Sequence, residues 1–407
     1  MTPTTSFGCI SCKVIRFHCI ARVIPHIASL IKGNIIDFPI ATAGYRKVRS
    51  IIAIFPIVFL LLACNAVADT QQAANSPAEL AVGQKATAID GGVMVVYQDQ
   101  NGHYWFGGND DGLYHYDGQE LRLIRKEDGL CSTAILGIQE DRHGNLYFDT
   151  TEGICRFDGQ SFITLEVVNT DFTKHNWQSG ANDLWFRMGW EHRGAFRYDG
   201  DSLYFLEFPE SNRAAAFYEK YPNSSYNPYG TYSHFQDSHG NVWFGTASLG
   251  LVRFDGTSLA WLYEQHLTET PRGGDFGIRS IVEDKDGFFW FCNSRYKYRV
   301  GPENEAGSQL IPYNREAGLA YQNQAVETDY PYFMYMTKDK TGDLWMLTGD
   351  EGIYRNKGQE LFHYPVQEDG KYLQLHSVYA DQKGQIWVGT QQQGVYHLQD
   401  DKFVRKF

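Results

Sequence analysis

The chain is poor in cysteine, with seven in 407 residues. Three lie before residue 45, and a fourth, Cys64, ends an apolar stretch. Only Cys131, Cys155 and Cys292 remain in the rest of the chain. Because an odd number of cysteines cannot all pair, we expect disulfides not to be the main covalent support, and we expect no bridge between Cys131 and Cys155.

Basic residues are also scarce beyond Cys64. Residues 65–407 hold 29 Lys and Arg against 47 Asp and Glu, a net charge of −18. Such a charge keeps a protein soluble and argues against nucleic acid as a partner. The same part shows no nucleophile elbow, zinc-binding helix motif or phosphate-binding loop. We therefore expect no metal and no cofactor, and the sequence names no enzyme chemistry by motif.

Residues 1–44 lack both turn signals and a helical period. Cys9 and Cys12 form a CxxC pair, but a second ligand pair at the usual zinc-finger spacing is missing. We interpret this segment as a disordered upstream extension that results from a wrongly assigned start codon.

Residues 45–64 have the layout of a secretory signal. Three basic residues precede an apolar core from Ile51 to Leu62, which is too short for a comfortable membrane span. The ending LLAC resembles the bacterial lipobox, which implies that Cys64 is lipidated and becomes the mature N-terminus. Because Asn65 follows rather than Asp, the resemblance implies an outer-membrane or periplasm-facing destination. An uncleaved signal anchor is the alternative.

Residues 65–89 are rich in alanine, glutamine and small polar residues, which is typical of a flexible linker. The sequence thus predicts an exported protein that is held to the membrane through its lipid anchor only.

From residue 90 to the C-terminus the chain repeats one unit, best seen from Asp237 to Gly256 as DSHGNVWFGTASLGLVRFDG. An Asp is followed by Gly three positions later and by an aromatic residue six positions later. The other intact copies are Asp99/Gly102/Trp105, Asp141/Gly144/Tyr147, Asp284/Gly287/Trp290, Asp339/Gly342/Trp345 and Asp381/Gly384/Trp387. A seventh, degenerate copy precedes Trp185, with Ser179 and Asn182 in the Asp and Gly positions.

Each unit predicts four short strands joined by tight turns. The Asp caps a turn in which Gly takes a positive φ, and the next stretch alternates like a half-buried strand around its Trp. A DG turn closes the third strand, and a fourth follows. Four antiparallel strands in each of seven repeats predict an all-β protein, a seven-bladed β-propeller over residues 90–407. How the ring closes stays open, because both ends complete their own blades and residues 79–90 could add an outer strand.

The pattern D-x-x-G-x-[LVI]-W-[FIV]-G-T-x-x-G-[LI]-x-R-[FY]-D-G resembles the two-component regulator propeller repeat. This repeat occurs in the sensor portions of bacterial hybrid sensor kinases, so the resemblance implies a ligand-binding sensor. In that family the propeller continues into a second domain, a membrane span and a kinase. This sequence stops at Phe407, so we expect it to act with a separate membrane sensor kinase or cyclase.

The loops after the Trp strand diverge most in blades three and five, which read WFRMGWEHRG and WFCNSRYKYR. Propellers bind ligands at one end of the channel, where loops vary. Aromatic rings interleaved with Arg suit a small carbohydrate or an anionic ligand, although solvated surface charge is the alternative. The candidate ligand-binding residues are Arg187, Trp190, Glu191, His192, Arg193, Arg295, Tyr296 and Lys297, with Tyr226 and Tyr229 from the connection before blade four.

Four arginines recur at one position of the repeat and are too regular to form a site. We expect them to pair with neighbouring carboxylates or to cover the Trp with their stems. They are Arg156, Arg197, Arg253 and Arg355.

Three functions compete. The leading one is a non-catalytic sensory lipoprotein that binds an oligosaccharide or a partner protein. The second is a lyase or hydrolase, because streptogramin lyases are similar propellers that use a His and a Glu with a metal, which Glu191 and His192 could imitate. The third is a protein-interaction scaffold. The enzyme requires converging acid and base groups, the sensor a cleft lined by aromatics and Arg, and the scaffold a flat face.

Overall fold

The structure is a computed structural model. It describes residues 80, 82–168, 179–264, 267, 277–292, 296–301, 309–318, 332–358 and 360–407. The predicted upstream extension, the signal segment with Cys64, and residues 65–79 of the predicted linker lie outside the described residues, so these assignments stay predictions.

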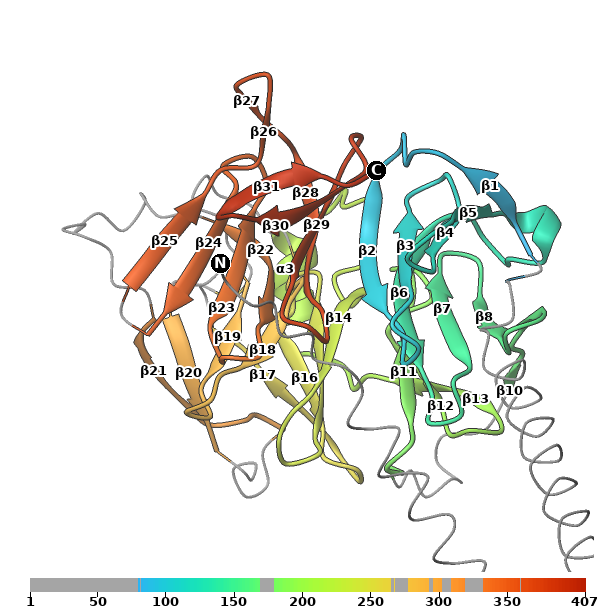
Figure 1. Ribbon diagram of the computed structural model, residues 1–407. Coiled ribbons are helices and arrows are strands. Elements are labelled where there is room, and N and C mark those ends of the chain that lie inside the picture. Colours follow the sequence, from blue (N-terminus) through green and yellow to red (C-terminus); the bar gives the residue numbers. More distant parts are fainter. Residues whose placement is uncertain are drawn as a thin grey trace, which may run out of the picture. The chain divides into compact units, whose positions relative to one another are not determined.

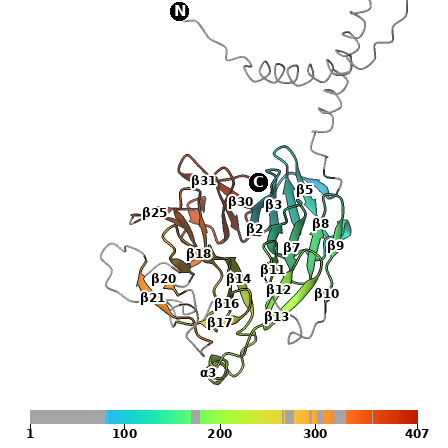
Figure 2. The ribbon, with the colours of Figure 1, turned by 90° about the horizontal axis from the view of Figure 1, so that it is seen from below.

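Seven sheets of four or five strands stand around a central channel, which confirms the seven-bladed propeller (Figures 1 and 2). Blades one to three contain, in chain order, β1 (Gln84–Ala86), β2 (Val93–Gln98), β3 (Tyr104–Gly108), β4 (Leu113–Tyr116), β5 (Leu121–Ile124), β6 (Ile135–Glu140), β7 (Leu146–Thr150), β8 (Ile154–Phe157), β9 (Phe162–Thr164), β10 (Val167–Val168), β11 (Leu184–Phe186), β12 (Gly194–Tyr198) and β13 (Leu203–Glu207).

Blades four to seven follow the same plan, with the chain returning beside blade one at its C-terminus (Figure 1). Their strands are β14 (Thr231–Gln236), β15 (Val242–Thr246), β16 (Leu251–Phe254), β17 (Leu259–Leu262), β18 (Ile281–Glu283), β19 (Phe289–Phe291), β20 (Tyr296–Val300), β21 (Tyr313–Ala317), β22 (Phe333–Lys338), β23 (Leu344–Thr348), β24 (Ile353–Lys357), β25 (Glu360–Tyr364), β28 (Leu375–Ala380), β29 (Ile386–Thr390), β30 (Val395–Gln399) and β31 (Lys402–Arg405).

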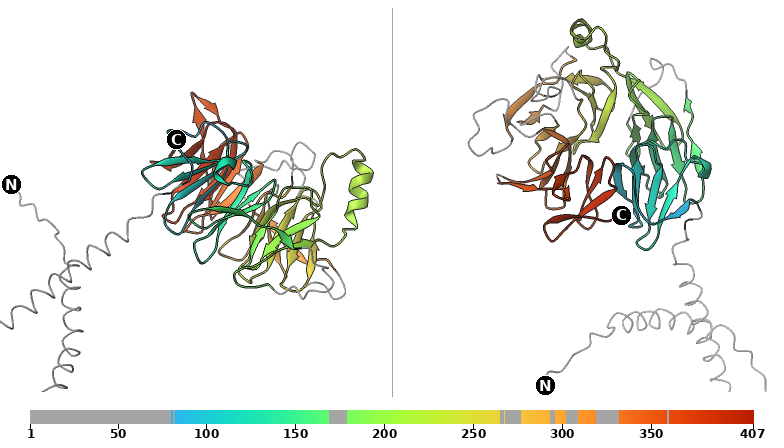
Figure 3. Two further views of the ribbon diagram at one scale, coloured as in Figure 1. Left: turned by 90° about the vertical axis from the view of Figure 1, so that its right-hand side faces the viewer. Right: turned by 90° about the horizontal axis from the view of Figure 1, so that it is seen from above.

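Few elements stand outside the blades. They are a one-turn 3₁₀ helix, η1 (Lys126–Asp128), the helix α3 (Arg213–Lys220), which stands at the rim in Figure 3, and a small hairpin of β26 (Gln367–Glu368) and β27 (Lys371–Tyr372). Within the described part of the chain, no helix is long and apolar enough to cross a membrane.

The strand before each Asp-Gly turn is innermost, and neighbouring inner strands such as β2, β6 and β28 touch around the channel. The second strand of a blade packs between two neighbouring blades. All five residues of β15 are therefore buried, and the same holds for β7, β23 and β29. Antiparallel pairing places the Asp-Gly turns at one end of the channel and the loops after the Trp strands at the other.

The Asp of each repeat does more than cap its turn. In blade four, Asp237 Oδ1 accepts from the backbone N–H groups of His239 and Asn241, each at 2.9 Å. Its Oδ2 accepts from Trp243 Nε1 at 2.8 Å. The same indole bond, at 2.8–3.0 Å, recurs in blades one, five, six and seven, and the hydroxyl of Tyr147 replaces the indole in blade two at 3.1 Å. One carboxylate thus joins the turn to the buried aromatic.

Blade three departs from the plan. Its described strands run in the order β10-β13-β12-β11, and β10 pairs with β13 in parallel. Among the residues that the structure describes, no strand lies inward of β11 in this sheet. Asp183 replaces the missing box Asp in part, since its carboxylate accepts from the Gly180 N–H at 2.7 Å and from the Arg197 guanidinium.

The ring closes without exchange of strands between blades one and seven. The strand β1 pairs with β5, so the segment before residue 90 adds a fifth, outer strand to blade one. Across the seam, Tyr104 Oη donates to Asp381 Oδ2 at 2.5 Å and Gln382 Nε2 donates to the Asp99 carbonyl at 2.9 Å. Val93 and Trp387 are buried in one shared apolar cluster. Packing and side-chain hydrogen bonds therefore hold the two ends together.

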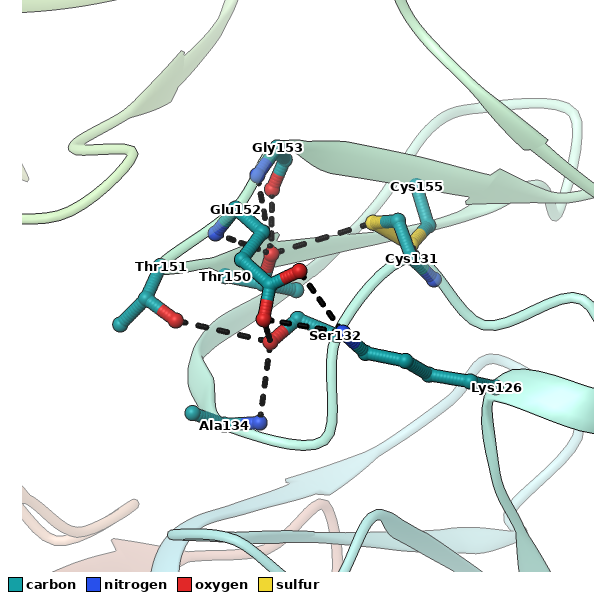
Figure 4. Close-up of polar contacts among 9 residues, drawn as sticks. All are labelled: Lys126, Cys131, Ser132, Ala134, Thr150, Thr151, Glu152, Gly153 and Cys155. Carbon is teal, nitrogen blue, oxygen red and sulfur yellow. Dashed lines mark hydrogen bonds and ion pairs between the residues drawn. A yellow bond between two sulfur atoms is a disulfide. The ribbon is translucent and has the colours of Figure 1, made fainter.

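The expectation that Cys131 and Cys155 form no bridge was wrong, because the two are disulfide-bonded (Figure 4). Cys131 lies in the connection that opens blade two, and Cys155 lies on β8. The Cα atoms of the two cysteines are 5.8 Å apart. Of the three cysteines in the described residues, the buried Cys292 keeps a free thiol. The odd number of cysteines therefore did not prevent the other two from pairing. An ion pair of 2.7 Å between Lys126 and Glu152 ties the same connection to the loop after β7.

Candidate functional site

A cavity of about 320 Å³ occupies the channel and is lined by the inner strands and by the loop after β11. Aromatic side chains, among them Tyr97, Trp190 and Tyr232, form much of its wall. Its charged lining residues are Arg187 and Arg279. The cavity therefore combines ring faces with guanidinium groups, which is the lining that the sequence leads us to expect for a bound ligand.

Arg187 is held on every side by protein groups. Its Nε lies 3.3 Å from Asp149 Oδ2, and the two side chains are 14% and 1% exposed. The Arg187 guanidinium also donates to the carbonyl of Tyr232 at 2.6 Å and to that of Leu136. Since Leu136 belongs to β6 and Tyr232 to β14, Arg187 bridges the inner strands of blades two and four across blade three. This geometry gives Arg187 a structural task.

The partners of this bridge occupy one position of the repeat, the residue two after the box aromatic. Blades one, four and seven have Gly there, because a Cβ on Gly389 would lie 2.2 Å from the Val93 carbonyl of the next inner strand. Blade two has Asp149 and blade three Arg187. The backbone N–H groups of Arg187 and Met188 also donate to Asp149, at 3.0 and 2.9 Å. The buried carboxylate of Asp149 thus lies beside blade three, for which the described residues include no strand inward of β11.

Trp190, Tyr232 and Arg279 line the same cavity. The Trp190 and Tyr232 rings lie 6.0 Å apart, and the guanidinium carbon of Arg279 lies 4.6 Å from the Tyr232 centroid. Arg279 Nη1 points to Tyr335 Oη at 3.4 Å. Trp190 Nε1 is buried and has no hydrogen-bond partner among the described residues. A buried N–H without an acceptor costs stability.

Two histidines near the channel stay neutral at physiological pH. Burial, with the charge of Arg187, lowers the pKa of His234 to about 4. Burial and the charge of Arg279 also lower the pKa of His376. The positive charge of the cavity therefore comes from its arginines.

The other predicted residues of blade three do not line the cavity. Glu191 is exposed and only its carbonyl is engaged, by Asn227 Nδ2 at 2.9 Å. His192 packs inside the blade, 5.0 Å from the Phe196 ring, and burial lowers its pKa. Arg193 forms ion pairs at the surface with Glu207 and Glu210. Glu191 and His192 are therefore not brought together at the channel.

The predicted tyrosines and the blade-five residues also lie away from it. Tyr229 is 7% exposed and packs against Trp261, whereas Tyr226 is 39% exposed with its hydroxyl 3.1 Å from Ser248. Tyr296 and Lys297 belong to the third strand of blade five, and Lys297 Nζ lies 3.9 Å over the Phe288 ring. Arg295 lies outside the described residues. Of the predicted set, the structure places Arg187 and Trp190 together in the cavity.

The recurrent arginines have the expected structural contacts in three blades. Arg197 binds Asp183, with Nε at 2.6 Å, and Arg355 binds Asp343 at 2.7 Å. Arg253 covers the Trp243 ring at 5.6 Å. Arg156, opposite Tyr147 in blade two, has a buried Nε without a hydrogen-bond partner.

A second hollow of about 610 Å³ lies at the seam of blades one and seven, among the Asp-Gly turns. Its Trp387 ring is stacked by His397, with centroids 5.2 Å apart, and its Asp381 carboxylate already binds Tyr104 and Trp387. The part of the chain that the structure describes holds no group of three or more His, Cys, Asp or Glu that could bind a metal.

No protein-family model matches the chain, and no curated protein sequence matches it. Solved structures do. The extracellular domain of a putative hybrid two-component system protein from B. thetaiotaomicron is 19% identical, with a TM-score of 0.51, over 77% of this chain and 39% of that one. Virginiamycin B lyase from Staphylococcus aureus is 16% identical, with a TM-score of 0.53, over 77% and 97%. At such identities the likeness shows the fold alone.

An ancestral GH74 enzyme is also similar, at 12% identity and a TM-score of 0.51, over 79% of this chain and 47% of that one. An extracellular domain of a two-component system protein and two enzymes thus share this propeller. This chain spans well under half of the two-component protein's domain, so its function must be argued from its own channel.

Proposed function

We propose that this protein is an exported sensory propeller that binds a small ligand in the channel cavity and acts with a separate membrane sensor. The channel cavity carries this proposal, because aromatic side chains, among them Trp190, line it together with two arginines. The resemblance of the repeat to two-component propellers supports the sensory part, as does the fold shared with an extracellular domain of a two-component system protein.

The disulfide supports the proposed export, because disulfides persist in oxidising compartments and are rare in the cytosol. We further propose that Cys64 carries the lipid. Metabolic labelling with an alkyne fatty acid should tag the wild-type protein and not the Cys64→Ser variant, with Cys292→Ser as a control that keeps the label. Label on the Cys64→Ser variant would contradict the anchor and leave the ligand site unaffected.

The geometry gives the lyase or hydrolase alternative no support at Glu191 and His192, because neither side chain lines the cavity. The scaffold alternative rests on a flat face, and the cavity at the channel favours ligand binding over it. The proposed ligands are a small carbohydrate or an anion.

A thermal-shift screen against mono- and oligosaccharides and organic acids tests the proposal. A ligand at one hundred times its dissociation constant should add about 2.7 kcal/mol of stability. The Trp190→Phe variant replaces an indole that lines the cavity by a smaller ring, so it should lose most of the shift.

Trp261→Phe is the matched control, since Trp261 Nε1 is also buried without a partner but lies on β17, away from the channel. This variant should keep the ligand-induced shift even if its own stability falls. A shift that survives in Trp190→Phe and disappears in Trp261→Phe would place the ligand elsewhere and overturn the proposed site.

A further inference from the structure

The seam hollow between blades one and seven is separate from the channel cavity. Its volume is about 610 Å³, and no described residue lines both sites. Blade one contributes Tyr104 from β3 and Tyr116 from β4, and blade seven contributes Trp387 from β29 and His397 from β30. The volume lies well within the roughly 300–1,000 Å³ of ligand pockets, so the hollow has room for a small molecule.

Aromatic rings form one wall of the seam hollow. Tyr104 and His397 both pack on Trp387, with ring centroids 4.6 and 5.2 Å apart. Trp387 is 4% exposed, whereas Tyr104, Tyr116 and His397 are half-buried. A buried indole thus supports rings that keep part of their surface open. Such rings offer a rigid apolar surface to the face of a ring-shaped ligand.

Exposed charged side chains of both signs line the same hollow. They are Lys383, Asp400, Asp401 and Lys406. Within the described part of the chain, these four side chains form no hydrogen bond and no ion pair. Lys406 Nζ lies 5.7 Å from the centroid of the Tyr116 ring, which places an ammonium group beside the aromatic wall. Two carboxylates and two ammonium groups are therefore available to a ligand, and their charges cancel.

Asp381 also lines the hollow, but its carboxylate is fully engaged. Its Oδ1 accepts from the backbone N–H groups of Lys383 and Gln385, each at 2.8 Å. Its Oδ2 accepts from Tyr104 Oη at 2.5 Å and from Trp387 Nε1 at 3.0 Å. Asp381 therefore builds the wall of the hollow and leaves recognition to the exposed groups.

The turn that carries the two exposed carboxylates has unusual residues for its shape. Gln399 pairs with Lys402, so Asp400 and Asp401 form a two-residue loop between β30 and β31, with φ values of 48° and 59°. Such a loop favours Asn-Gly or Asp-Gly, because a Cβ resists positive φ. A comparable loop, Asp369-Gly370 between β26 and β27, has the favoured Gly. Strain at Asp401 therefore indicates that its side chain has a task in the hollow.

We propose that the seam hollow is a second ligand site and binds a neutral polyhydroxylated ring, which is the chemistry of a sugar. A hydroxyl group both donates and accepts, so it can donate to the Asp400 and Asp401 carboxylates and accept from a lysine. The aromatic wall receives the apolar face of the ring. An anion would meet the two carboxylates and a cation the two ammonium groups. This site does not depend on the proposed channel site.

Titration calorimetry tests the inference with matched sugars: glucose beside glucuronate and glucosamine, and galactose beside galacturonate and galactosamine. At least one neutral sugar should bind about tenfold more tightly than both of its charged forms, because a charged group would face a like charge in the hollow. Its affinity should change little as salt is raised. A charged form that binds as well as its neutral parent would overturn the ligand class, and no binding by either neutral sugar would overturn the site.

The double variant Asp400→Asn/Asp401→Gly separates recognition from folding. It gives the loop its favoured residues and removes both carboxylates, so the unfolding midpoint should stay or rise while sugar binding weakens about tenfold. The matched control is Asp369→Asn, which changes a carboxylate in the comparable loop outside the hollow and should keep the affinity. Unchanged sugar affinity in the double variant would contradict the proposed role of the two carboxylates and overturn the site.

The same titrations in Trp190→Phe distinguish the seam hollow from the channel. Seam binding should be unchanged in this variant, because Trp190 does not line the hollow. Sugar binding that is lost in Trp190→Phe and kept in Asp400→Asn/Asp401→Gly would belong to the channel, which would support the proposed function and overturn the seam inference. The opposite pattern would support the seam site, whatever the channel binds.

Discussion

At the scale of single residues, the box Asp explains why the repeat tolerates so much variation elsewhere. The Asp284 carboxylate in blade five accepts hydrogen bonds from the backbone N–H groups of Asp286 and Phe288, both at 2.9 Å. It also accepts one from the Trp290 indole N–H at 2.8 Å. Three donors depend on one side chain, and Trp290 is buried. The sequence pattern revealed the turn cap but not the indole bond, because a spacing of six residues does not show where a ring turns back.

Asp284→Ala should lower the free energy of unfolding by about 3 kcal/mol, because it leaves an indole and two amide N–H groups without acceptors. Asp286→Ala, two residues away in the same turn, removes only an exposed carboxylate and should stay within about 0.5 kcal/mol of wild type. Urea unfolding of both variants measures the difference. Equal losses would show that the box bonds contribute little.

A second residue-scale feature is His115, which stands opposite Trp105, where blades two to six have Arg or Lys and blade seven has His397. It is 3% exposed, and its Nε2 lies 3.1 Å from His103 Nδ1. Burial, followed by the charge of His103, lowers the pKa of His115 from 6.5 to about 4. A neutral ring therefore packs on Trp105 without a charge.

This pKa predicts acid sensitivity. Between pH 6.5 and about 4 the unfolded chain binds a proton that folded His115 does not, so stability falls as the pH falls, by up to about 1.4 kcal/mol per unit. Above pH 6.5 the contribution is constant. His115→Asn should flatten the fall, and substitution of the exposed His239 should not. Urea unfolding from pH 7 to 4.5 gives the slopes, and an unchanged slope in His115→Asn contradicts the assignment.

At the scale of elements, blade three is the exception among the blades. The sequence indicates that this blade departs from the repeat, but not the structural reason. Ser179 and Asn182 showed a damaged box, and the loop with Arg187 showed divergence. We interpreted that divergence as a ligand site. The structure shows that Asp149 and Arg187 replace the same repeat position in adjacent blades and bind each other. Comparison of this repeat position across the blades could have revealed the pair, because Asp149 and Arg187 carry opposite charges where the other five blades have uncharged residues.

Arg187→Ala should cost about 3–5 kcal/mol, because it strands the buried Asp149 carboxylate. Arg193→Ala, six residues on, breaks ion pairs whose side chains are 32% and 51% exposed and should cost at most about 1 kcal/mol. Adding Asp149→Ala to Arg187→Ala should cost little more, since the two act as a unit. Additive losses in this double-mutant cycle, measured in urea, would argue against the bridge.

The disulfide of blade two is a second element-scale device. It closes a loop with a sequence separation of 24 and holds the opening connection against β8. Chain-entropy arguments give about 3 kcal/mol for a loop of this length. Reduction should lower the unfolding midpoint of the wild-type protein and leave a Cys131→Ser/Cys155→Ser variant unchanged. If reduction leaves the unfolding midpoint of the wild-type protein unchanged, the bridge adds no stability.

At the scale of the whole molecule, the sequence could predict the ring but not its closure or its channel. Repetition shows each blade, because its turns and Trp are local features. The fifth strand β1, the seam bond from Tyr104 to Asp381 and the contacts of Tyr232 with Trp190 and Arg279 join residues that are far apart along the chain. Arg279 gave no signal, since it lies in the connection between β17 and β18 without a repeated position.

The central claim is that the protein binds its ligand in the channel cavity, and a crystal structure with the best ligand from the screen tests it most directly. We predict ligand density in the channel, in contact with the Trp190 and Tyr232 side chains that line the cavity. The Arg187 contacts to Asp149 should be unchanged. Density in the seam hollow beside Trp387, with an empty channel, would contradict the claim.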